Sequence, residues 1–370
     1  RFQTAFQTLL RSLRQENLKL ARDEVIAETA ARTFGLLITG AALAWMAFRA
    51  MTGLITLGQL TLFYQAFYRG QGLMRSLLQN VGQMYANMLF LSHLFEFLDL
   101  QPQLLDPPQP SPVVVPLTEG IRFDQVTFRY PGSDRPALRN FNLLIPAGKT
   151  VAVVGSNGAG KSTLIKLACR LYDPEQGQVE LDGVNLRDLS LQELRANIGV
   201  LLQEPVHYNE TVAENIGLGD VSAAMDSARI ETAAVAAAAH EVVDRLPQGY
   251  DTLLGKWFVD GTELSVGEWK RICLARTFFR RAPIILLDEP TAGMDAWAET
   301  EWLDRFTRMA RDKTAVLITH RFTTAMRADL IYVMQQGEIV ESGSHKQLLA
   351  EGGEYAQSWR QQRQEPPVDS

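Results

Sequence analysis

The sequence predicts two kinds of structure in one chain: an all-α helical hairpin that spans a membrane, followed by an α/β domain built on a parallel sheet. Three observations lead to this fold class. Residues 30–95 contain no Asp, Glu or Lys, six prolines crowd into residues 101–118, and the remainder holds short apolar runs separated by helical stretches. With 370 residues, the chain is long enough for two or three domains.

Composition excludes several classes of protein. Hydrophobic residues make up 46% of the chain and charged residues 21%, so it is neither disordered nor fibrous. The formal net charge of −6 is uneven, because basic residues exceed acidic ones before residue 100 and acidic residues dominate after it. An acidic C-terminal part argues against nucleic acid as a partner. Cys169 and Cys273 lack the spacing of a disulfide framework or a zinc site and are interpreted as apolar core residues.

The first 100 residues are interpreted as a partial transmembrane domain. A first span is expected at about 30–50, where an uncharged core of suitable length is flanked by arginines, and a second, more polar span at about 59–80. A basic, periodic segment before the first span would extend it as a cytoplasmic helix. Because Arg and Lys concentrate there and the connector between the spans is uncharged, both chain ends are expected in the cytoplasm. A buried, soluble helical hairpin is the alternative, and no secretory signal is visible.

The second span carries polar side chains at steps of three and four residues, which places them on one helical face. Such a stripe could line a transport pathway, or it could pack against other helices, and the sequence favours neither interpretation. The stripe consists of Tyr64, Tyr68, Gln71, Arg75 and Gln79.

The prolines mark a linker at 101–117, because they remove amide donors and fix an extended course. An α/β domain is expected at 118–355, followed by a polar tail at 356–370. Its later strands are continuous apolar runs, typical of strands buried on both faces of a sheet. The expected strands are residues 121–130, 150–154, 198–202, 284–287 and 315–319.

Phosphate chemistry is indicated directly after the second of these strands. The run GSNGAGKST fits the pattern G-x-x-x-x-G-K-[ST] and lies between a strand and a helix, as its mechanics require. Glycines let successive amides turn toward phosphates, Lys161 neutralises them and the Ser162 hydroxyl can ligate Mg²⁺. The loop predicts an α/β P-loop NTPase fold, with phosphate-binding residues Gly155, Ser156, Asn157, Gly158, Ala159, Gly160, Lys161, Ser162 and Thr163.

Two further segments could complete such a site. The strand at 284–287 ends in Asp288 and Glu289, of which the first suits Mg²⁺ and the second suits activation of a water. Between the two motifs, Ser265 and Glu268 have the S-x-x-E spacing of a capping box at a helix start. A capped helix start is also an anion receptor.

The order of these motifs resembles the nucleotide-binding domain of ATP-binding cassette (ABC) proteins. The resemblance covers about residues 118–355, and the preceding hairpin looks like the last two membrane helices of a type I exporter half-transporter, in which four further helices come first. The motifs that carry it are Tyr130, the phosphate loop, Gln203, the signature at 264–268, Asp288 with Glu289, Asp295 and His320.

The resemblance implies a role for each motif. Tyr130 would stack on adenine, and Gln203 would contact Mg²⁺ or the attacking water beside the cytoplasmic loops of the membrane domain. Glu289 would be the general base, and His320 would hold the γ-phosphate and orient the water. The metal would be held by Ser162, Gln203 and Asp288.

The resemblance also implies a dimer. In this family the signature closes over the nucleotide of a partner subunit, so Ser265, Gly267 and Glu268, together with Asp295, would act across the interface. Two ATP molecules would be sandwiched, and closure would switch the membrane helices between inward and outward access. The signature departs from the family pattern at Val266, where glycine is usual, and at Glu268, where glutamine is common.

The leading hypothesis is an ATP-hydrolysing exporter subunit in the inner membrane, with a multi-pass membrane domain and a cytoplasmic nucleotide-binding domain. Its partner would be a second half-transporter subunit, in a homodimer or a heterodimer. Membrane lipid would surround it. Its solute could be a drug, a lipid or a peptide. The alternative is a non-transport ABC ATPase that acts as a mechanical clamp in translation or DNA repair, but the acid-free stretch at 30–95 argues against it. An ATP-sensing regulator with an inactive site is disfavoured because Lys161, Glu289 and His320 are all present.

Overall fold

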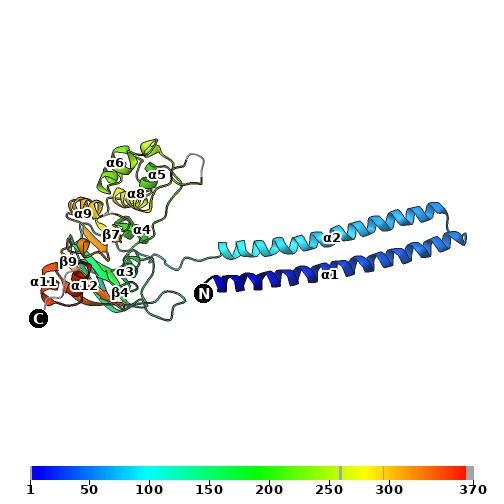
Figure 1. The fold of residues 1–370 in the computed structure, drawn as a ribbon, viewed down its shortest axis with the longest axis horizontal. Helices are drawn as coiled ribbons and strands as arrows, with labels where there is room; N and C mark the ends of the chain where they lie inside the picture. The colour runs from blue at the N-terminus through cyan, green and yellow to red at the C-terminus, as the bar shows by residue number, and fades with distance from the viewer. Residues whose placement is uncertain (1, 258–260, 295, 364–370) are drawn as a thin grey trace. The chain divides into compact units, whose positions relative to one another are not determined.

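The computed structural model describes residues 2–257, 261–294 and 296–363, and these form two compact units, residues 1–101 and 102–370. The first unit is a helical hairpin of α1 (Phe2–Met51) and α2 (Leu57–Leu98) (Figure 1). At about 1.5 Å per residue, the 50 residues of α1 exceed the length that crosses a bilayer. The basic segment before the first expected span is therefore helical, as predicted.

Local sequence explains where α2 begins and how the hairpin closes. Thr56 caps α2, because its side chain accepts from the Gln59 amide while the Gln59 side chain accepts from the Thr56 amide. Between the helices, Gln71 Nε2 donates to Thr39 Oγ1 at 2.9 Å. Gln71 belongs to the polar stripe, so this member of the stripe packs on α1. Among the described residues, one helix is long and apolar enough to cross a membrane, within Arg14–Met51, and the more polar α2 is not such a helix.

The second unit contains two sheets, whose strands the structure orders as β2-β1-β4-β5 and β10-β9-β3-β8-β7-β6. In the larger sheet β9, β3, β8, β7 and β6 run parallel and β10 is antiparallel. The smaller sheet is antiparallel. The strands are β1 (Gly120–Phe128), β2 (Leu138–Pro146), β3 (Thr150–Gly155), β4 (Gln176–Leu181), β5 (Val184–Asn185), β6 (Ile198–Leu201), β7 (Ile284–Asp288), β8 (Thr314–Ile318), β9 (Leu330–Gln335) and β10 (Glu338–Gly343).

Helices cover the larger sheet and build a separate lobe. In Figure 1, α5, α6 and α8 gather above the strands, while α11 and α12 lie beside β9. The helices are α3 (Lys161–Ala168), α4 (Leu191–Ala196), α5 (Val212–Gly217), α6 (Ser227–Ala236), α7 (His240–Val243), α8 (Val266–Phe279), α9 (Ala296–Met309), α10 (Phe322–Ala325), α11 (His345–Glu351) and α12 (Glu354–Arg363).

The central strands are buried on both faces, as their apolar runs predict. Alternate side chains of β7 enter different clusters: Ile284 and Leu286 pack between the two sheets, whereas Ile285 and Leu287 pack against the helical lobe. Cys169 and Cys273 are buried free thiols. Because β3, β8, β7 and β6 are parallel neighbours, their carboxyl ends lie at one edge of the sheet.

The structure differs from the sequence analysis at the C-terminus, where a polar tail was expected from residue 356. Residues 354–363 form α12, and Tyr355, Ala356 and Trp359 are buried. Tyr355 and Trp359 are four residues apart, so they share a helical face and both pack against Phe322. Burial of two large aromatic rings therefore fixes this helix to the domain.

The sequence analysis also missed five strands, namely β2, β4, β5, β9 and β10. Residues of β2, β4 and β10 alternate between more and less buried positions, because these strands lie in the antiparallel sheet or at the edge of the larger one, and β5 has only two residues. These strands lack the continuous apolar run of the central ones. Strand β9 is different, because it lies between β10 and β3 and its residues 330–334 form a continuous hydrophobic run, so the sequence contained a signal for it.

Candidate nucleotide-binding site

The order of the larger sheet brings the predicted motifs to one edge. The phosphate loop follows β3 and Gln203 follows β6. Asp288 ends β7, Glu289 comes directly after it, and His320 follows β8. These strands are parallel and adjacent in the order β3-β8-β7-β6, so their carboxyl ends meet. Asp288 pairs with Ile318 in the register of β7 and β8, which places the residues after them side by side.

A cavity of about 310 Å³ lies at this edge. Most of the predicted nucleotide and metal residues contribute to its wall. The lining consists of Tyr130, Ala137, Asn157, Gly158, Gly160, Lys161, Ser162, Thr163, Gln203, Asp288 and Glu289. Gly155 and Ser156 line a neighbouring cavity together with His320.

The phosphate loop needs glycine where it leaves β3 and where it enters α3. Gly155 has φ +150°, and a Cβ there would lie 2.1 Å from the Met334 carbonyl oxygen. Gly160 has φ +99°, and a Cβ there would lie 2.7 Å from the Ala137 carbonyl oxygen. A side chain at either position would collide with fixed backbone, so the loop's close packing depends on both glycines.

Lys161 is the first residue of α3, and 7% of its surface is exposed. Its Nζ donates to the carbonyl oxygens of Gly155 at 2.8 Å and Ser156 at 2.9 Å. Burial lowers the pKa of Lys161, and the nearby carboxylates of Glu289 and Asp288 oppose that shift. The loop thus holds a cation against its own backbone, where phosphate oxygens can replace the carbonyls.

The two acids after β7 have different environments. Asp288 is 2% exposed, and burial raises its pKa while a hydrogen bond from Ser162 lowers it. Glu289 is more exposed, has φ +49° and lies with Oε1 3.3 Å from His320 Nδ1. A non-glycine residue with positive φ is strained, which is common where a side chain is aimed at a reacting centre. The pair therefore combines a buried carboxyl group with a more exposed carboxylate that contacts a histidine.

Tyr130 lies at the edge of the cavity, two residues beyond β1. Its hydroxyl lies 3.1 Å from Thr163 Oγ1, and Lys166 Nζ lies 5.0 Å from the centre of its ring. Phe128 and Tyr172 meet the ring edge-on. These contacts hold the aromatic ring in a fixed position beside the phosphate loop.

The signature residues do not line this cavity. Ser265 caps α8 in a box with Glu268, as the sequence predicts, and Glu268 also meets Arg245 at 3.2 Å. The amide of Ser265 donates to the carboxylate of Glu268 and, together with Arg245, lowers its pKa. Val266 is 76% exposed. Gly267 packs closely against Gly293, because a Cβ added to Gly267 would lie 2.8 Å from the Gly293 carbonyl oxygen. Asp295 lies outside the described residues.

One charged residue near the site was not singled out from the sequence. Lys270 on α8 is 6% exposed, and burial lowers its pKa while Glu289 and Asp288 raise it. Lys161 on α3 and Lys270 on α8 are therefore both buried lysines that interact electrostatically with Asp288 and Glu289. The sequence signal is weak, because one lysine in an apolar helix usually extends to solvent.

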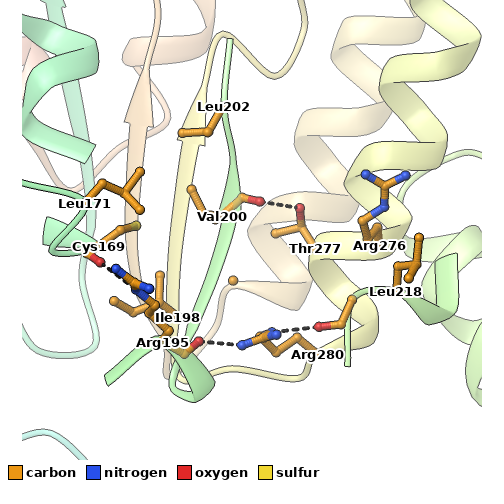
Figure 2. Close-up of a pocket in the computed structure, with 12 residues that line it drawn as sticks. Cys169, Leu171, Arg195, Ile198, Val200, Leu202, Leu218, Arg276, Thr277 and Arg280 are labelled. Carbon is orange, nitrogen blue, oxygen red and sulfur yellow. Dashed lines mark hydrogen bonds between the residues drawn. The ribbon is translucent and has the colours of Figure 1, made fainter. Parts of the chain in front are cut away.

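A second cavity, of about 320 Å³, lies between β6 and α8 and is shown in Figure 2. Leu202, next to Gln203, lines it. Thr277 donates to the Val200 carbonyl at 3.0 Å, and Arg280 bridges the carbonyl oxygens of Arg195 and Gly219. This second cavity therefore lies where the sheet meets the helical lobe, and its wall is largely apolar.

Comparison with known proteins identifies the domain that builds this site. A family model described as ABC transporter matches residues 138–292. The chain is 36% identical, over 96% of its length, to an ATP-dependent lipid A-core flippase of Haemophilus ducreyi, of which it covers 60%. It is 43% identical, over 70% of its length, to the corresponding flippase of Syntrophus aciditrophicus, of which it covers 42%.

A solved structure agrees with these relatives. The structure of a bacterial Atm1-family ABC exporter with ATP bound superposes with a TM-score of 0.69, at 33% identity, over 90% of this chain and 57% of that one. The chain thus spans between about two fifths and three fifths of the length of these relatives.

Proposed function

We propose that this chain, which belongs to the ABC transporter family, works in an exporter subunit that couples ATP binding and hydrolysis to transport across a membrane. The observation that carries the proposal is the cavity at the sheet edge. It brings together the phosphate loop, Gln203 and the Asp288–Glu289 pair, and Glu289 contacts His320. The match to an exporter with ATP bound supports the same function.

The chain divides into parts with different tasks in this proposal. Residues 1–100 belong to a transmembrane domain with spans at about 30–50 and 59–80, residues 101–117 link it to the next domain, and residues 118–355 bind the nucleotide. The exposed apolar side chains along both helices of the hairpin support a lipid-facing role for it. The nucleotide-binding domain would lie in the cytoplasm at the inner membrane.

The residues of the cavity have the chemistry that MgATP requires. The phosphate loop, residues 155–163, would surround the β- and γ-phosphates, with Lys161 as counter-charge and Tyr130 against adenine. The Ser162 hydroxyl, the Gln203 amide and the Asp288 carboxylate are oxygen donors of the kind that Mg²⁺ prefers, and bound Mg²⁺ would neutralise charge on the phosphates. Ser162 and Asp288 already share a hydrogen bond, so their oxygens converge.

Glu289 is the proposed general base, and His320 would hold the γ-phosphate and orient the attacking water. The 3.3 Å contact between their side chains supports a joint role, because the two groups already face one another. Asp288 is 2% exposed and shares a hydrogen bond with Ser162, so its carboxylate lies beside another proposed metal ligand.

The partner in this proposal is a second subunit of the same kind. Ser265, Gly267 and Glu268 lie outside the cavity of their own chain, and Val266 beside them is exposed, so this surface is open to another molecule. Together with Asp295 they would complete the partner's nucleotide site.

Among the three solute classes of drug, lipid and peptide, the names of the bacterial relatives favour a lipid. The non-transport clamp is disfavoured, because the similarity to a lipid flippase covers 96% of the chain and so includes the hairpin.

The experiment is reconstitution of the full-length protein in liposomes that contain a fluorescent lipid, with phosphate release and lipid movement between leaflets recorded together. We expect MgATP hydrolysis and ATP-dependent lipid movement. Drug and peptide substrates tested in parallel would distinguish the solute classes. An absence of MgATP hydrolysis would contradict the proposed function, and extraction from cells without detergent would favour the clamp.

A further inference from the structure

The turn that carries His320 is contacted by the C-terminal helix. Gln362, near the end of α12, donates from Nε2 to the His320 carbonyl oxygen at 2.7 Å. Its Oε1 accepts from the Phe322 amide at 3.2 Å. One side-chain amide therefore binds the backbone on both sides of a single turn, and both bonds act on the segment that aims the imidazole.

Helix α12 is firmly attached to the same turn. Tyr355 is fully buried and Trp359 is 7% exposed, and their rings lie 5.1 and 6.5 Å from that of Phe322. Gln362 follows Trp359 by three residues and Tyr355 by seven, so all three occupy one helical face. The amide of Gln362 is therefore presented to the turn by a packed helix, although the residue itself is exposed.

The same turn is also held by a buried acid. Arg321 forms an ion pair with Glu299, which is 6% exposed, and also donates to the Met294 carbonyl at 3.3 Å. Glu299 accepts in addition from the hydroxyls of Thr324 at 2.5 Å and Thr291 at 3.4 Å. The turn is thus held through the side chain of Arg321 by a buried network and through the backbone of His320 and Phe322 by Gln362.

Space remains on the side of Gln362. A cavity of about 460 Å³ is lined by the phosphate loop, by His320 and by α12, including Gln362. The imidazole of His320 is half exposed and meets Glu289 at 3.3 Å. On the side of this cavity, the two bonds of Gln362 add to the packing of Phe322 against Tyr355 and Trp359, and they act directly on the backbone of His320 and Phe322.

We propose that Gln362 is a positioning residue for ATP hydrolysis. It fixes the backbone of residues 320–322, and through it the distance and direction of the His320 imidazole relative to Glu289 and the γ-phosphate. The inference rests on the proposed function. A misplacement of about 1 Å can cost about two orders of magnitude in rate, so a contact outside the reacting atoms can control turnover.

The test compares Gln362→Met, which keeps length and removes both bonds, with Gln357→Met on the exposed face of the same helix. For Gln362→Met we expect kcat for MgATP to fall about 5- to 10-fold, as for the loss of one or two modest hydrogen bonds. KM and the melting temperature should stay unchanged, and Gln357→Met should match the wild type. Gln362→Glu keeps an acceptor for Phe322 and loses the donor to His320, so its kcat should fall as well.

A second measurement separates positioning from a general structural role. In a His320→Ala background the positioned group is absent, so adding Gln362→Met should change the residual turnover less than twofold. An unchanged kcat in Gln362→Met, or an equal fall in both backgrounds, would overturn the inference. If Gln362→Met does not fold, the same criteria apply to Gln362→Glu. A wild-type protein without ATPase activity would instead overturn the proposed function.

Discussion

The phosphate loop and the signature segment each lead into the N-terminus of a helix, yet they present different surfaces. The phosphate loop lies against Asp288, Glu289 and Gln203, and its lysine is buried and bound to its own backbone. The signature instead exposes Val266 to solvent and pairs Glu268 with Arg245. One region is organised within the chain and the other is open to solvent; in the proposed function they are the two half-sites of nucleotide sites that are shared between two subunits.

The largest effect should come from the half-site that contains the phosphate loop and the acid pair. Glu289→Gln keeps size and removes the base, so we expect steady-state ATPase to fall by about 100-fold or more while ATP still binds. Phosphate release and binding of a fluorescent ATP analogue measure the two quantities. Glu338→Gln, at an exposed acid, is the control. Normal turnover in the Glu289 variant would show that the base lies elsewhere.

Lys161→Ala should weaken MgATP binding by about 10- to 100-fold, because the phosphates lose a charge-assisted hydrogen bond of about 1.5–3 kcal/mol. Equilibrium binding of the fluorescent analogue checks this value, and Lys149→Ala, at an exposed lysine before β3, should bind normally. Unchanged affinity together with unchanged hydrolysis would mean that the loop is not the nucleotide site.

A substitution in the half-site that faces solvent should change ATPase activity less, and it should raise the activity. Val266 stands where the family usually has glycine, and its exposed methyl groups would keep a partner's γ-phosphate from the first amides of α8. We expect Val266→Gly to raise the ATPase activity of the assembled transporter severalfold at most, since one improved amide contact contributes about 0.5–1.5 kcal/mol. Val221→Gly, at another exposed valine, controls for the substitution itself. Equal or lower turnover would show that Val266 does not hinder closure.

The smallest effect is expected at Glu268. Glu268→Gln keeps an acceptor for the capping box and removes a negative charge that hydrogen bonds and Arg245 hold ionised through a lowered pKa. Exposed ion pairs contribute about 0–1 kcal/mol, so the melting temperature should change little. ATPase activity should rise less than about twofold. A larger change in thermal stability would show that the pair with Arg245 holds the signature helix in place.

Much of the nucleotide site could be predicted because its motifs are local in the sequence. The phosphate loop, the S-x-x-E cap of α8 and the apolar runs of β3, β6, β7 and β8 depend on spacings of a few residues, and the structure contains each of them. Dihedral preferences, capping and side-chain alternation act over that same range.

Contacts between distant residues were decided by the tertiary structure. Glu289 meets His320 because β7 and β8 are neighbouring parallel strands, an order that no local pattern specifies. Lys270 joins the field of the acid pair, and Gln362 reaches the turn after β8, because helices pack onto that sheet. The sequence by itself therefore determined the chemical groups and the local backbone of the site. Only the packing of the sheet and helices decided which groups meet, because burial and strand order are properties of the whole domain.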